Sequence, residues 1–517
     1  MIYIANKKSS LFLSLMLIST SPQSALYRVI EVTSPTDAVE SYGISIEHDS
    51  SDTDCFSTYC ADDAYALAGE TFNGTEGFSY KEEVPFAIDN RFYYLDYDDL
   101  EDYCDDELGY STCDYWAYNH WYGDIDSDIG GLKNEREAFY EADYQTNNTA
   151  FYDDETFTFV PDPGDNAPSE SDYSYYFVED TDDKVVNKMT IDSDNEEYVI
   201  GNTSSGYYAY GDNYIRMYRQ RGYYLTGSEE VVLEPEADTS LTFADSSGEQ
   251  NIISQMGQTM AFDSFSYNDQ TYIVGSASVA TFYYDDDYKD YDSENTTDSD
   301  DEDVTNCVDY SEPAFYPECQ NFGFATRAFI WNISDANGPN SDENRFSAVD
   351  WETDTDSTYY DYNDDEASAQ ASIRGATIAN GGTYDSLPVL VGYNTDIDDD
   401  NDNFVMQAAI FRPTSTTSFS VSENAWTTVF IEDATVEVDD YYIHSNSVVT
   451  DINENLIVIG HAKRDGDYPS GSVSDNRMFI ADANDDEPSA SFFNSQGETI
   501  FLAVPAEMPM PSMITMR

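Results

Sequence analysis

The segment Leu390-Val391-Gly392, followed 16 residues after the glycine by Ala408-Ala409, is one of five copies of the pattern that decides the fold. In each copy, a short apolar run ends in glycine. A second run follows, in which a small or apolar residue comes directly before a position that is usually occupied by an aromatic residue. The spacings from the glycine to the residue before that position are 16, 16, 53, 16 and 18. Such repetition indicates one supersecondary unit used several times. The other copies are Leu67-Ala68-Gly69 with Pro85-Phe86, Val199-Ile200-Gly201 with Met217-Tyr218, Ile273-Val274-Gly275 with Ala328-Phe329, and Val458-Ile459-Gly460 with Met478-Phe479.

A spacing of 16 residues suits two strands of about five residues and a connecting loop, which is an antiparallel hairpin. Polar turns precede several of the glycines, as in Asp192-Ser193-Asp194 and Asp451-Ile452-Asn453-Glu454, and Asp and Asn favour turns because their side chains bond the local backbone. Each unit therefore reads as strand, tight turn, strand ending in glycine, loop and strand. The glycine marks either a close backbone approach or a simple strand end. We predict an all-β, β-propeller-like array of five or six antiparallel units with acidic insertion loops.

The repeats divide the chain into a signal peptide at residues 1–25, a β-repeat domain at 26–500 and an atypical tail at 501–517. Insertions are expected at about residues 96–168 and 283–323, and insertions in a repeat map to loops on one face. Glu135–Asp143 is the best helix candidate. The tail holds four of the twelve methionines; it is either an altered end of the reading frame or an ordinary apolar strand with a frayed end.

The charge of the chain is strongly negative, with 103 Asp and Glu against 21 Lys and Arg and a net charge of −82. Phosphate backbones and anionic membrane surfaces would be repelled, which excludes nucleic acid as a partner. Two carboxylates about 6 Å apart in water repel by roughly 0.7 kcal/mol, so the fold needs screening by salt or bound cations. Aromatic residues make up 15% of the chain, which is enough to build a core and argues against disorder.

The first 25 residues resemble a secretory signal, with Lys7 and Lys8 before the short apolar run Leu11–Ile18. That run is too short to span a bilayer, and cleavage is expected after Ala25. The alternative is an uncleaved apolar N-terminus. No transmembrane segment is expected after signal removal, and the mature protein is expected to be periplasmic, at the outer surface or secreted.

The six cysteines fall into three close pairs, and an even count in an exported chain predicts disulfides. Local pairing is the simplest connectivity, although sequence does not fix it. A zinc site is the competing interpretation, weakened by the absence of CxxC spacing. The pairs are Cys55 with Cys60, Cys104 with Cys113, and Cys307 with Cys319.

Alternating carboxylates at Asp396, Asp398, Asp400 and Asp402 form the best metal candidate. They lie in the loop between Gly392 and Ala408, where several oxygens could face one Ca²⁺, an ion that takes six to eight of them. The loop lacks the glycine and the distal glutamate of an EF-hand, so a solvated acidic loop is the alternative. Asp482–Asp486 and Asp285–Asp287 are weaker candidates of the same kind.

Catalytic signals are poor, because HExxH, GxSxG and phosphate-binding glycine loops are all absent from the sequence. A carboxylate pair could serve a glycosidase, but in so acidic a chain such pairs arise by chance. No catalytic residue or cofactor is assigned. The tyrosine run Tyr207–Tyr210 could line a carbohydrate groove, although such runs more often fill sheet cores and faces.

Several segments resemble an uncharacterised secreted family of marine Gram-negative bacteria, the family of domains of unknown function numbered 3466. The carrying segments are Ala25–Val29, Phe78–Leu95, Tyr103–Trp116, Gly201–Tyr208 and Tyr218–Tyr223. The repeats are also similar to the HAF repeats of extracellular bacterial proteins, best at Asp451–Glu454 with Ile459-Gly460 and at Arg327–Trp331. The resemblance implies export and a repeated β-fold, and it implies no activity.

Two functions follow as hypotheses. In the first, the chain is a non-enzymatic exported protein that binds an unknown protein or glycan at the cell envelope through its insertion loops, or serves as a structural part of that envelope. In the second, it is an exported hydrolase with a carboxylate pair in a propeller cleft. A deep pocket with convergent acids would favour the hydrolase, and loops projecting from a filled face would favour binding.

Overall fold

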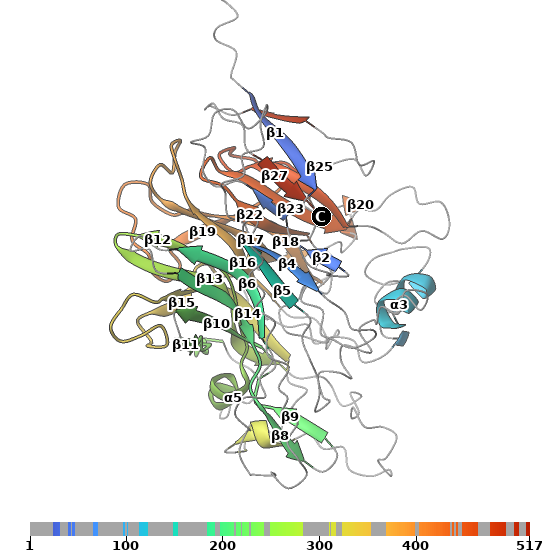
Figure 1. The fold of residues 1–517 in the computed structure, drawn as a ribbon, viewed down its shortest axis with the longest axis vertical. Coiled ribbons are helices and arrows are strands. Elements are labelled where there is room, and N and C mark those ends of the chain that lie inside the picture. The colour runs from blue at the N-terminus through green and yellow to red at the C-terminus, as the bar shows by residue number, and fades with distance from the viewer. Residues whose placement is uncertain are drawn as a thin grey trace, which may run out of the picture.

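A computed structural model places the repeats in a succession of antiparallel β-sheets (Figure 1). The structure describes residues 24–31, 40–42, 44–46, 66–70, 97–98, 101, 113–122, 148–152, 184–191, 197–210, 213–218, 220–226, 229–241, 249–282, 310, 312–316, 323–352, 369–398, 403–434, 437–438, 441–442, 447–463, 476–492, 501–505 and 513–516.

Each glycine of the repeat lies in a sheet of its own, so the predicted all-β repeat is confirmed. The first sheet contains Gly69 and consists of β2 (Glu40–Tyr42), β4 (Ala66–Glu70) and β5 (Asn148–Tyr152). The second contains Gly201 and consists of β6 (Lys184–Ile191), β7 (Glu197–Thr203), β10 (Arg221–Thr226) and β11 (Glu229–Val232).

The next three sheets each have four strands in simple up-and-down order. The third consists of β12 (Thr259–Tyr267), β13 (Gln270–Phe282), β14 (Gly323–Asn332) and β15 (Arg345–Ser347). The fourth consists of β16 (Ser372–Ile378), β17 (Pro388–Asp398), β18 (Asn403–Pro413) and β19 (Trp426–Phe430). The fifth consists of β22 (Ser447–Ile452), β23 (Ile457–Lys463), β24 (Asn476–Asp482) and β25 (Ser491–Phe492).

A terminal sheet combines strands from both ends of the described chain. Its order is β26 (Phe501–Pro505), β1 (Ser24–Glu31), β27 (Met513–Met516) and β3 (Ile44–Ile46). The strands of the tail therefore pair with an N-terminal strand, and the two interpretations of the tail stay predictions. Residues 1–23 lie outside the described part of the chain, so the signal peptide stays a prediction.

Short elements complete the structure. Two hairpins are formed by β8 (Tyr207–Tyr210) with β9 (Asn213–Arg216) and by β20 (Glu437–Val438) with β21 (Tyr441–Tyr442). The described residues include the helices α3 (Cys113–Tyr122) and α5 (Glu249–Met256) and the 3-10 turn η3 (Pro313–Phe315). Within the described ranges, no helix is long and apolar enough to cross a membrane.

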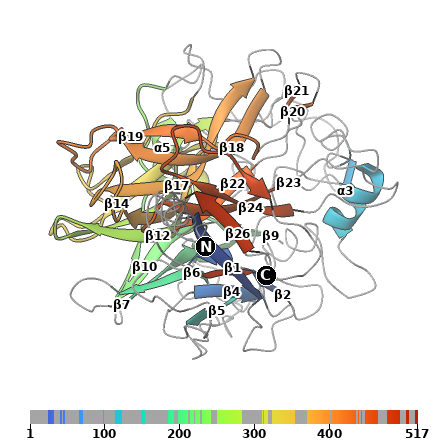
Figure 2. The same cartoon turned by 90° about the horizontal axis from the view of Figure 1, so that it is seen from above.

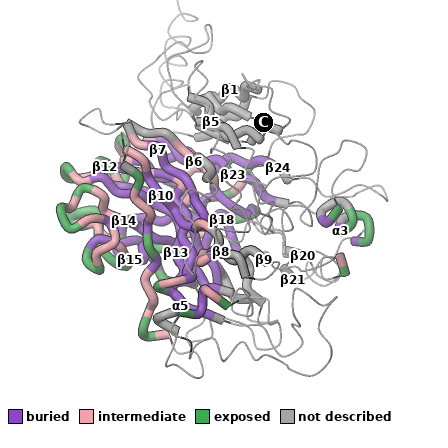
Figure 3. The backbone as a smooth tube through the Cα atoms, turned by 60° about the horizontal axis from the view of Figure 1, so that its bottom comes forward, coloured by how far each residue is buried: buried purple, intermediate pink, exposed green. Residues whose placement is uncertain are grey.

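The sheets pack against one another in chain order (Figure 2). In the second to fifth sheets, the first strand makes the contact with the sheet before it. Strand β6 contacts the first sheet, β12 the second, β16 the third and β22 the fourth. Strand β3 of the terminal sheet contacts the fifth. In the third, fourth and fifth sheets, runs of consecutive residues in the inner strands β13, β17 and β23 are buried, so both faces of these strands are covered (Figure 3).

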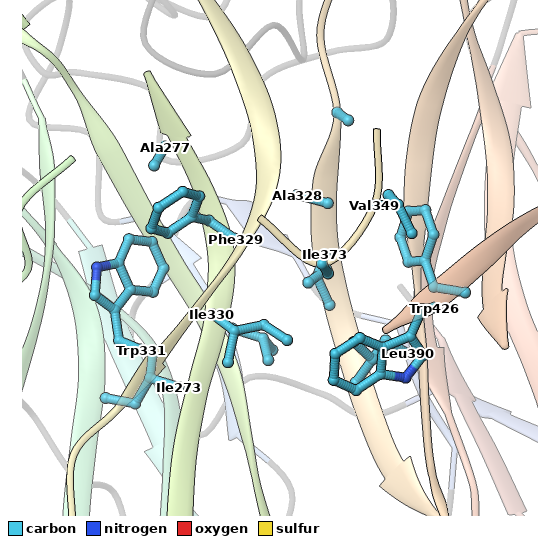
Figure 4. Close-up of a cluster of buried hydrophobic side chains, with 14 of the residues drawn as sticks. Ile273, Ala277, Ala328, Phe329, Ile330, Trp331, Val349, Ile373, Leu390 and Trp426 are labelled. Atoms are coloured by element: carbon cyan, nitrogen blue, oxygen red, sulfur yellow. The ribbon is translucent and has the colours of Figure 1, made fainter. Parts of the chain in front are cut away.

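The largest apolar cluster lies between the second, third and fourth sheets. Figure 4 shows Ile330 and Trp331 of the third sheet on one side and Ile373 and Leu390 of the fourth on the other. The ring nitrogen of Trp331 donates to the carbonyl oxygen of Glu234 at 3.1 Å, so this fully buried side chain leaves no polar atom unpaired. Burying a side chain of this size stabilises the fold by roughly 2–3 kcal/mol. A second cluster, which includes Val391 and Phe479, joins the fourth and fifth sheets.

The repeat glycines lie inside strands and not at their ends, which corrects the strand-end interpretation. Gly275 lies within β13 and Gly392 within β17, and both strands continue well past them. At each glycine the ladder to the first strand of the sheet shifts by one residue, which is a β-bulge. The bulge brings the carbonyl oxygens of Met260 and Ser372 over these glycines, where a Cβ would overlap them. The close-approach interpretation is therefore confirmed.

The aromatic position of the pattern is the ladder partner of the glycine in three of the five copies. Gly275 pairs with Phe329, Gly392 with Ala409, and Gly460 with Phe479. The spacing of 53 in the third copy arises because the interval predicted as an insertion separates β13 from β14.

The partners predicted for the other two copies need correction. Gly201 pairs with Tyr223, not Tyr218, because the β8–β9 hairpin occupies the chain between β7 and β10. Gly69 pairs with Thr149 of β5, far beyond Pro85-Phe86, which lies outside the described residues. The interval predicted as an insertion at 96–168 therefore contains a strand of the first sheet.

Sequence reasoning missed both described α-helices. In α3, Cys113, Ala117 and Trp121 are buried while Tyr115, Tyr118 and Tyr122 are exposed, so large apolar groups lie on both faces and the usual apolar–polar contrast is absent. Helix α5 is only eight residues long, and it buries Ile252, Ile253 and Met256. The helix predicted at 135–143 lies outside the described residues.

Candidate functional site

Four residues occupy equivalent positions in the strand ladders of four different sheets, although their spacing in the sequence does not show this. Immediately after the bulge, the first strands of the second to fifth sheets carry Lys188, Asp263, Gly375 and Asp451. They pair with Ile200, Val274, Val391 and Ile459, each of which directly precedes a repeat glycine. Because these are the strands that contact the preceding sheets, the four positions form a row across the stack. We call Lys188, Asp263, Gly375 and Asp451 the bulge row.

Asp263 is the centre of the bulge row. Its Oδ1 lies 2.6 Å from the Lys188 Nζ and accepts a hydrogen bond from the Ser264 amide at 2.6 Å. Its Oδ2 accepts a hydrogen bond from the Ala376 amide of the fourth sheet at 3.0 Å. The Asp263 side chain is 2% exposed, and that of Lys188 is 26% exposed. One carboxylate therefore ties the second, third and fourth sheets together.

Lys188 lies between two carboxylates. Burial works against its charge, but the negative charges of Asp263 and Asp451 outweigh this effect, so the pKa of Lys188 is raised above its usual value. Asp451 is itself buried, and its Oδ1 accepts a hydrogen bond from the Ile452 amide at 2.9 Å. At Gly375 a Cβ would lie 3.1 Å from the Asp451 Cα, so glycine allows the fifth sheet to approach the fourth.

The bulged residues themselves add further links between the same sheets. Asn187 donates from Nδ2 to the Ala261 carbonyl oxygen of the third sheet at 2.6 Å. The guanidinium of Arg374 in the fourth sheet lies 3.8 Å from the ring centre of Phe262 in the third. Neighbouring sheets are thus joined by polar and cation–π contacts as well as by apolar packing.

The contacts of the bulge row link neighbouring sheets and do not resemble a catalytic site. A glycosidase needs one carboxyl that holds a proton and a second that stays charged. In the bulge row, both oxygens of Asp263 accept hydrogen bonds or an ion pair, and Oδ1 of Asp451 accepts a hydrogen bond from the Ile452 amide. Two acids do converge here, but their described contacts are structural.

A second group of side chains offers chemistry at the surface. On α3, Tyr115, Tyr118 and Tyr122 are 50%, 40% and 42% exposed. Tyr97 stacks on Tyr122 with ring centres 6.1 Å apart, and Tyr118 lies 5.0 Å from Tyr122. Helix α3 stands apart from the sheets in the views of Figures 1 and 2. We call Tyr97, Tyr115, Tyr118 and Tyr122 the tyrosine face.

The predicted calcium loop lies at the end of the β17–β18 hairpin. Asp396 and Asp398 belong to β17, where Asp398 pairs with Asn403, whereas Asp400 and Asp402 lie outside the described residues. Among described side chains, no group of three or more His, Cys, Asp or Glu could hold a metal. Calcium at Asp396, Asp398, Asp400 and Asp402 therefore stays a proposal.

The weaker candidate at 482–486 is organised by a cation of the protein itself. Arg412 donates to the carbonyl oxygens of Ala483, at 2.9 Å, and of Asp485. Asp482 accepts a hydrogen bond from the Asn484 amide, and its pKa is raised by burial. A guanidinium on the loop carbonyls disfavours a second cation there. Asp285–Asp287 lies outside the described residues.

The cysteine pairings also stay a prediction. Cys113 is buried at the start of α3, and the other five cysteines lie outside the described residues. The side chains of Tyr207–Tyr210 are likewise not described, so the carbohydrate-groove interpretation is not tested.

The bulge row gave no usable signal in the sequence. Its members precede the repeat glycines by 13, 12, 17 and 9 residues, because the turn between the first and second strands differs in length from sheet to sheet. Only the ladder register aligns them. The tyrosine face was missed for the reason that α3 was missed.

Comparisons with known proteins give a family and no activity. A family model described as a protein of unknown function (DUF3466) matches residues 6–501. No curated protein matches the chain. Among solved structures, a crystal structure of a mutant B. megaterium levansucrase is 9% identical, covers 64% of this chain and 69% of its own, and has a TM-score of 0.22. That similarity is too low to carry an argument about fold or function.

Proposed function

The chain belongs to DUF3466, a family of proteins of unknown function, and we propose that it is an exported, propeller-like scaffold that binds a partner at the cell envelope. The propeller-like ring is supported by the packing of successive sheets through their first strands. It is also supported by the terminal sheet, in which β1 pairs with both β26 and β27. Joining the two ends of a chain in one sheet is a way to close a ring of sheets and leave few exposed edges.

One observation carries the choice of binding over catalysis. The acids that meet between the sheets, Asp263 and Asp451, are buried and engaged by Lys188 and by backbone amides. Meanwhile, three of the four large apolar side chains that are exposed among the described residues lie on α3, between β4 and β5. The interior thus serves stability, and the chain between strands of the first sheet carries exposed contact groups. Large exposed apolar groups that cluster mark interaction surfaces.

The exported hydrolase remains the second candidate because two acids and a lysine converge in the bulge row. The partner in the first case is a protein or glycan of the envelope, and Ca²⁺ at the β17–β18 loop is a proposed aid to binding. Export itself predicts a mature protein that begins at Leu26, which the intact mass of protein recovered from the periplasm or medium would test.

Cosedimentation with purified envelope fractions tests the binding function. We expect saturable binding that unlabelled protein competes away, with and without Ca²⁺ at constant ionic strength. The Asp263→Asn and Asp451→Asn variants should bind as the unaltered protein does wherever they remain folded. If the protein instead releases soluble sugar from the envelope, and folded Asp451→Asn does not, the hydrolase is correct and the binding scaffold is wrong.

A further inference from the structure

The tyrosine face is a set of aromatic rings held in place at the surface. Tyr115, Tyr118 and Tyr122 follow one another at spacings of three and four residues, so they share one side of α3. Cys113, Ala117 and Trp121 fill the other side and are buried. Since the other side is buried, the exposed side is presented to solvent as a unit.

Ring contacts and a hydrogen bond fix the geometry of the face. Tyr122 is stacked against Tyr97 and is tilted at 47° against Tyr118. The hydroxyl of Tyr97 donates to the Asp114 carbonyl oxygen at 3.0 Å, which ties the added ring to the first turn of the helix. A preorganised surface of this kind loses little side-chain entropy when a ligand binds.

The charge around the face is negative. Asp98 and Asp114 are exposed and Glu101 is half-buried. Burial, a hydrogen bond to Glu101 and the charges of Glu101, Asp114 and Asp98 together raise the pKa of Tyr97 to about 12. The Tyr97 ring therefore stays neutral at ordinary pH, and the electron-rich faces of the rings lie among carboxylates. Both features attract a cation, because an aromatic face and a carboxylate each stabilise positive charge.

We propose that the tyrosine face binds a basic segment of a partner protein, with arginine or lysine side chains on the rings and the flanking carboxylates around them. The proposal rests on the proposed binding function and names the chemistry of the partner. The net charge of −82 would draw such a segment toward the chain. The same contact occurs within this protein, where the Arg221 guanidinium lies 4.2 Å from the ring centre of Tyr218.

Other occupants fit the observations less well. A neutral sugar would use the rings but not the acids, and an anionic polymer would be repelled by them. An amino sugar shares the cationic chemistry, so it is an arm of the test. A basic protein segment is the better match because arginine, with its planar delocalised charge, stacks on aromatic faces while its N–H groups reach carboxylates.

The test uses the full-length protein and a fluorescently labelled peptide of eight arginines, with binding followed by fluorescence anisotropy. Tyr118→Leu and Tyr122→Leu remove a ring without changing the charge. Each should raise the Kd about two- to fivefold, and the double variant about tenfold. Tyr118→Phe keeps the ring and should bind within twofold of the unaltered protein. Tyr316→Leu is the matched control, because Tyr316 is 39% exposed and lies beside η3, outside the tyrosine face.

Nonspecific attraction to a polyanion would give a different pattern. In that case all variants would bind the peptide equally, and the proposal is wrong. It is also wrong if the peptide does not bind, or if a glucosamine oligomer binds in a ring-dependent way while the peptide does not. Thermal melting of each variant confirms that the fold is intact. If one leucine variant fails to fold, the other single leucine variant serves as the readout, because the proposal requires its binding to be weakened.

The outcome also separates this proposal from the proposed function. Envelope binding that is unchanged in the Tyr118→Leu/Tyr122→Leu double variant would overturn the basic-segment proposal and leave the binding scaffold standing. Ring-dependent binding of the peptide without any binding to envelopes would contradict the scaffold function alone.

Discussion

Replacing Gly392 by alanine should destabilise the protein strongly, although it adds a single methyl group. The added Cβ would overlap the carbonyl oxygen of Ser372 and lie 2.9 Å from its carbonyl carbon and 3.0 Å from the Ile373 Cα. All three atoms belong to the backbone of β16, which forms the bulge opposite Gly392. A flexible side chain could turn away from the new methyl group, but this backbone is fixed by the ladder on both sides of the bulge.

The magnitude follows from what has to move. Overpacking a buried site costs about 1–3 kcal/mol. Moving Ser372 also breaks a ladder hydrogen bond in a buried region, which costs about 1–3 kcal/mol more. We therefore expect the free energy of unfolding to fall by about 2–6 kcal/mol, a large part of the 5–15 kcal/mol typical of a folded domain.

Chemical denaturation followed by circular dichroism measures this change. Gly338→Ala is the control, because no atom lies within 4 Å of its added Cβ and only its φ of +79° opposes alanine. The control should lose about 1–2 kcal/mol. A glycine that merely ended a strand would give the opposite sign for Gly392→Ala, a gain of about 0.5–1 kcal/mol. A Gly392→Ala protein as stable as the control, or more stable, would refute the close-approach argument.

Three further changes test the contacts between and within the sheets. Lys188→Met leaves Asp263 and Asp451 buried without their cation and should lower the free energy of unfolding by about 2–4 kcal/mol. Because the pKa of Lys188 is raised in the folded state, the loss of stability relative to the unaltered protein should be complete below pH 10 and should shrink above about pH 10.5. Denaturation at pH 8 and pH 11 measures this loss, and an equal loss at both pH values would contradict the prediction. Asn453→Ala removes the oxygen that accepts hydrogen bonds from the Asn455 and Ile457 amides in the β22–β23 turn. The free energy of unfolding should fall by about 2 kcal/mol. An unchanged denaturation midpoint would mean that the turn forms without the Asn453 side chain. Arg221→Met removes the hydrogen-bond donors to the carbonyl oxygens of Ser254, Gln255 and Gly257 at the end of α5. The free energy of unfolding should fall by about 2–4 kcal/mol. If the amides of α5 exchange hydrogen no faster than in the unaltered protein, Arg221 does not stabilise the helix end.

The repeat was visible in the sequence because its cause is local. Apolar runs around Gly275, Gly392 and Gly460 are strands buried on both faces, and such strands read as continuous hydrophobic segments. Their partners Phe329, Ala409 and Phe479 were found because one loop joins two adjacent strands. The spacing predicted the wrong partners for Gly201 and Gly69, because a hairpin or a long segment intervenes and the nearest aromatic residue is not the true partner.

The candidate sites at the surface could not be predicted in the same way. The tyrosine face was hidden because α3 carries aromatic residues on both sides, and no periodic signal separates the buried side from the exposed one. The acidic loop around Asp398 was easy to see, but composition could not say whether its carboxylates share an ion. In a chain with 103 acids, an acidic cluster carries little information by itself.

The sequence by itself determined the all-β class, the repeated unit, the strong negative charge and the resemblance to an uncharacterised family. These depend on residue type and on spacing over short distances. Only the tertiary structure decided that Lys188, Asp263 and Asp451 meet, because turns of unequal length put them at unequal distances from the repeat glycines. Ladder register restores their equivalence through backbone hydrogen bonds, which leave no mark on residue spacing. The contact between one sheet and the next is likewise a long-range property, set by which faces remain to be buried once each sheet has formed.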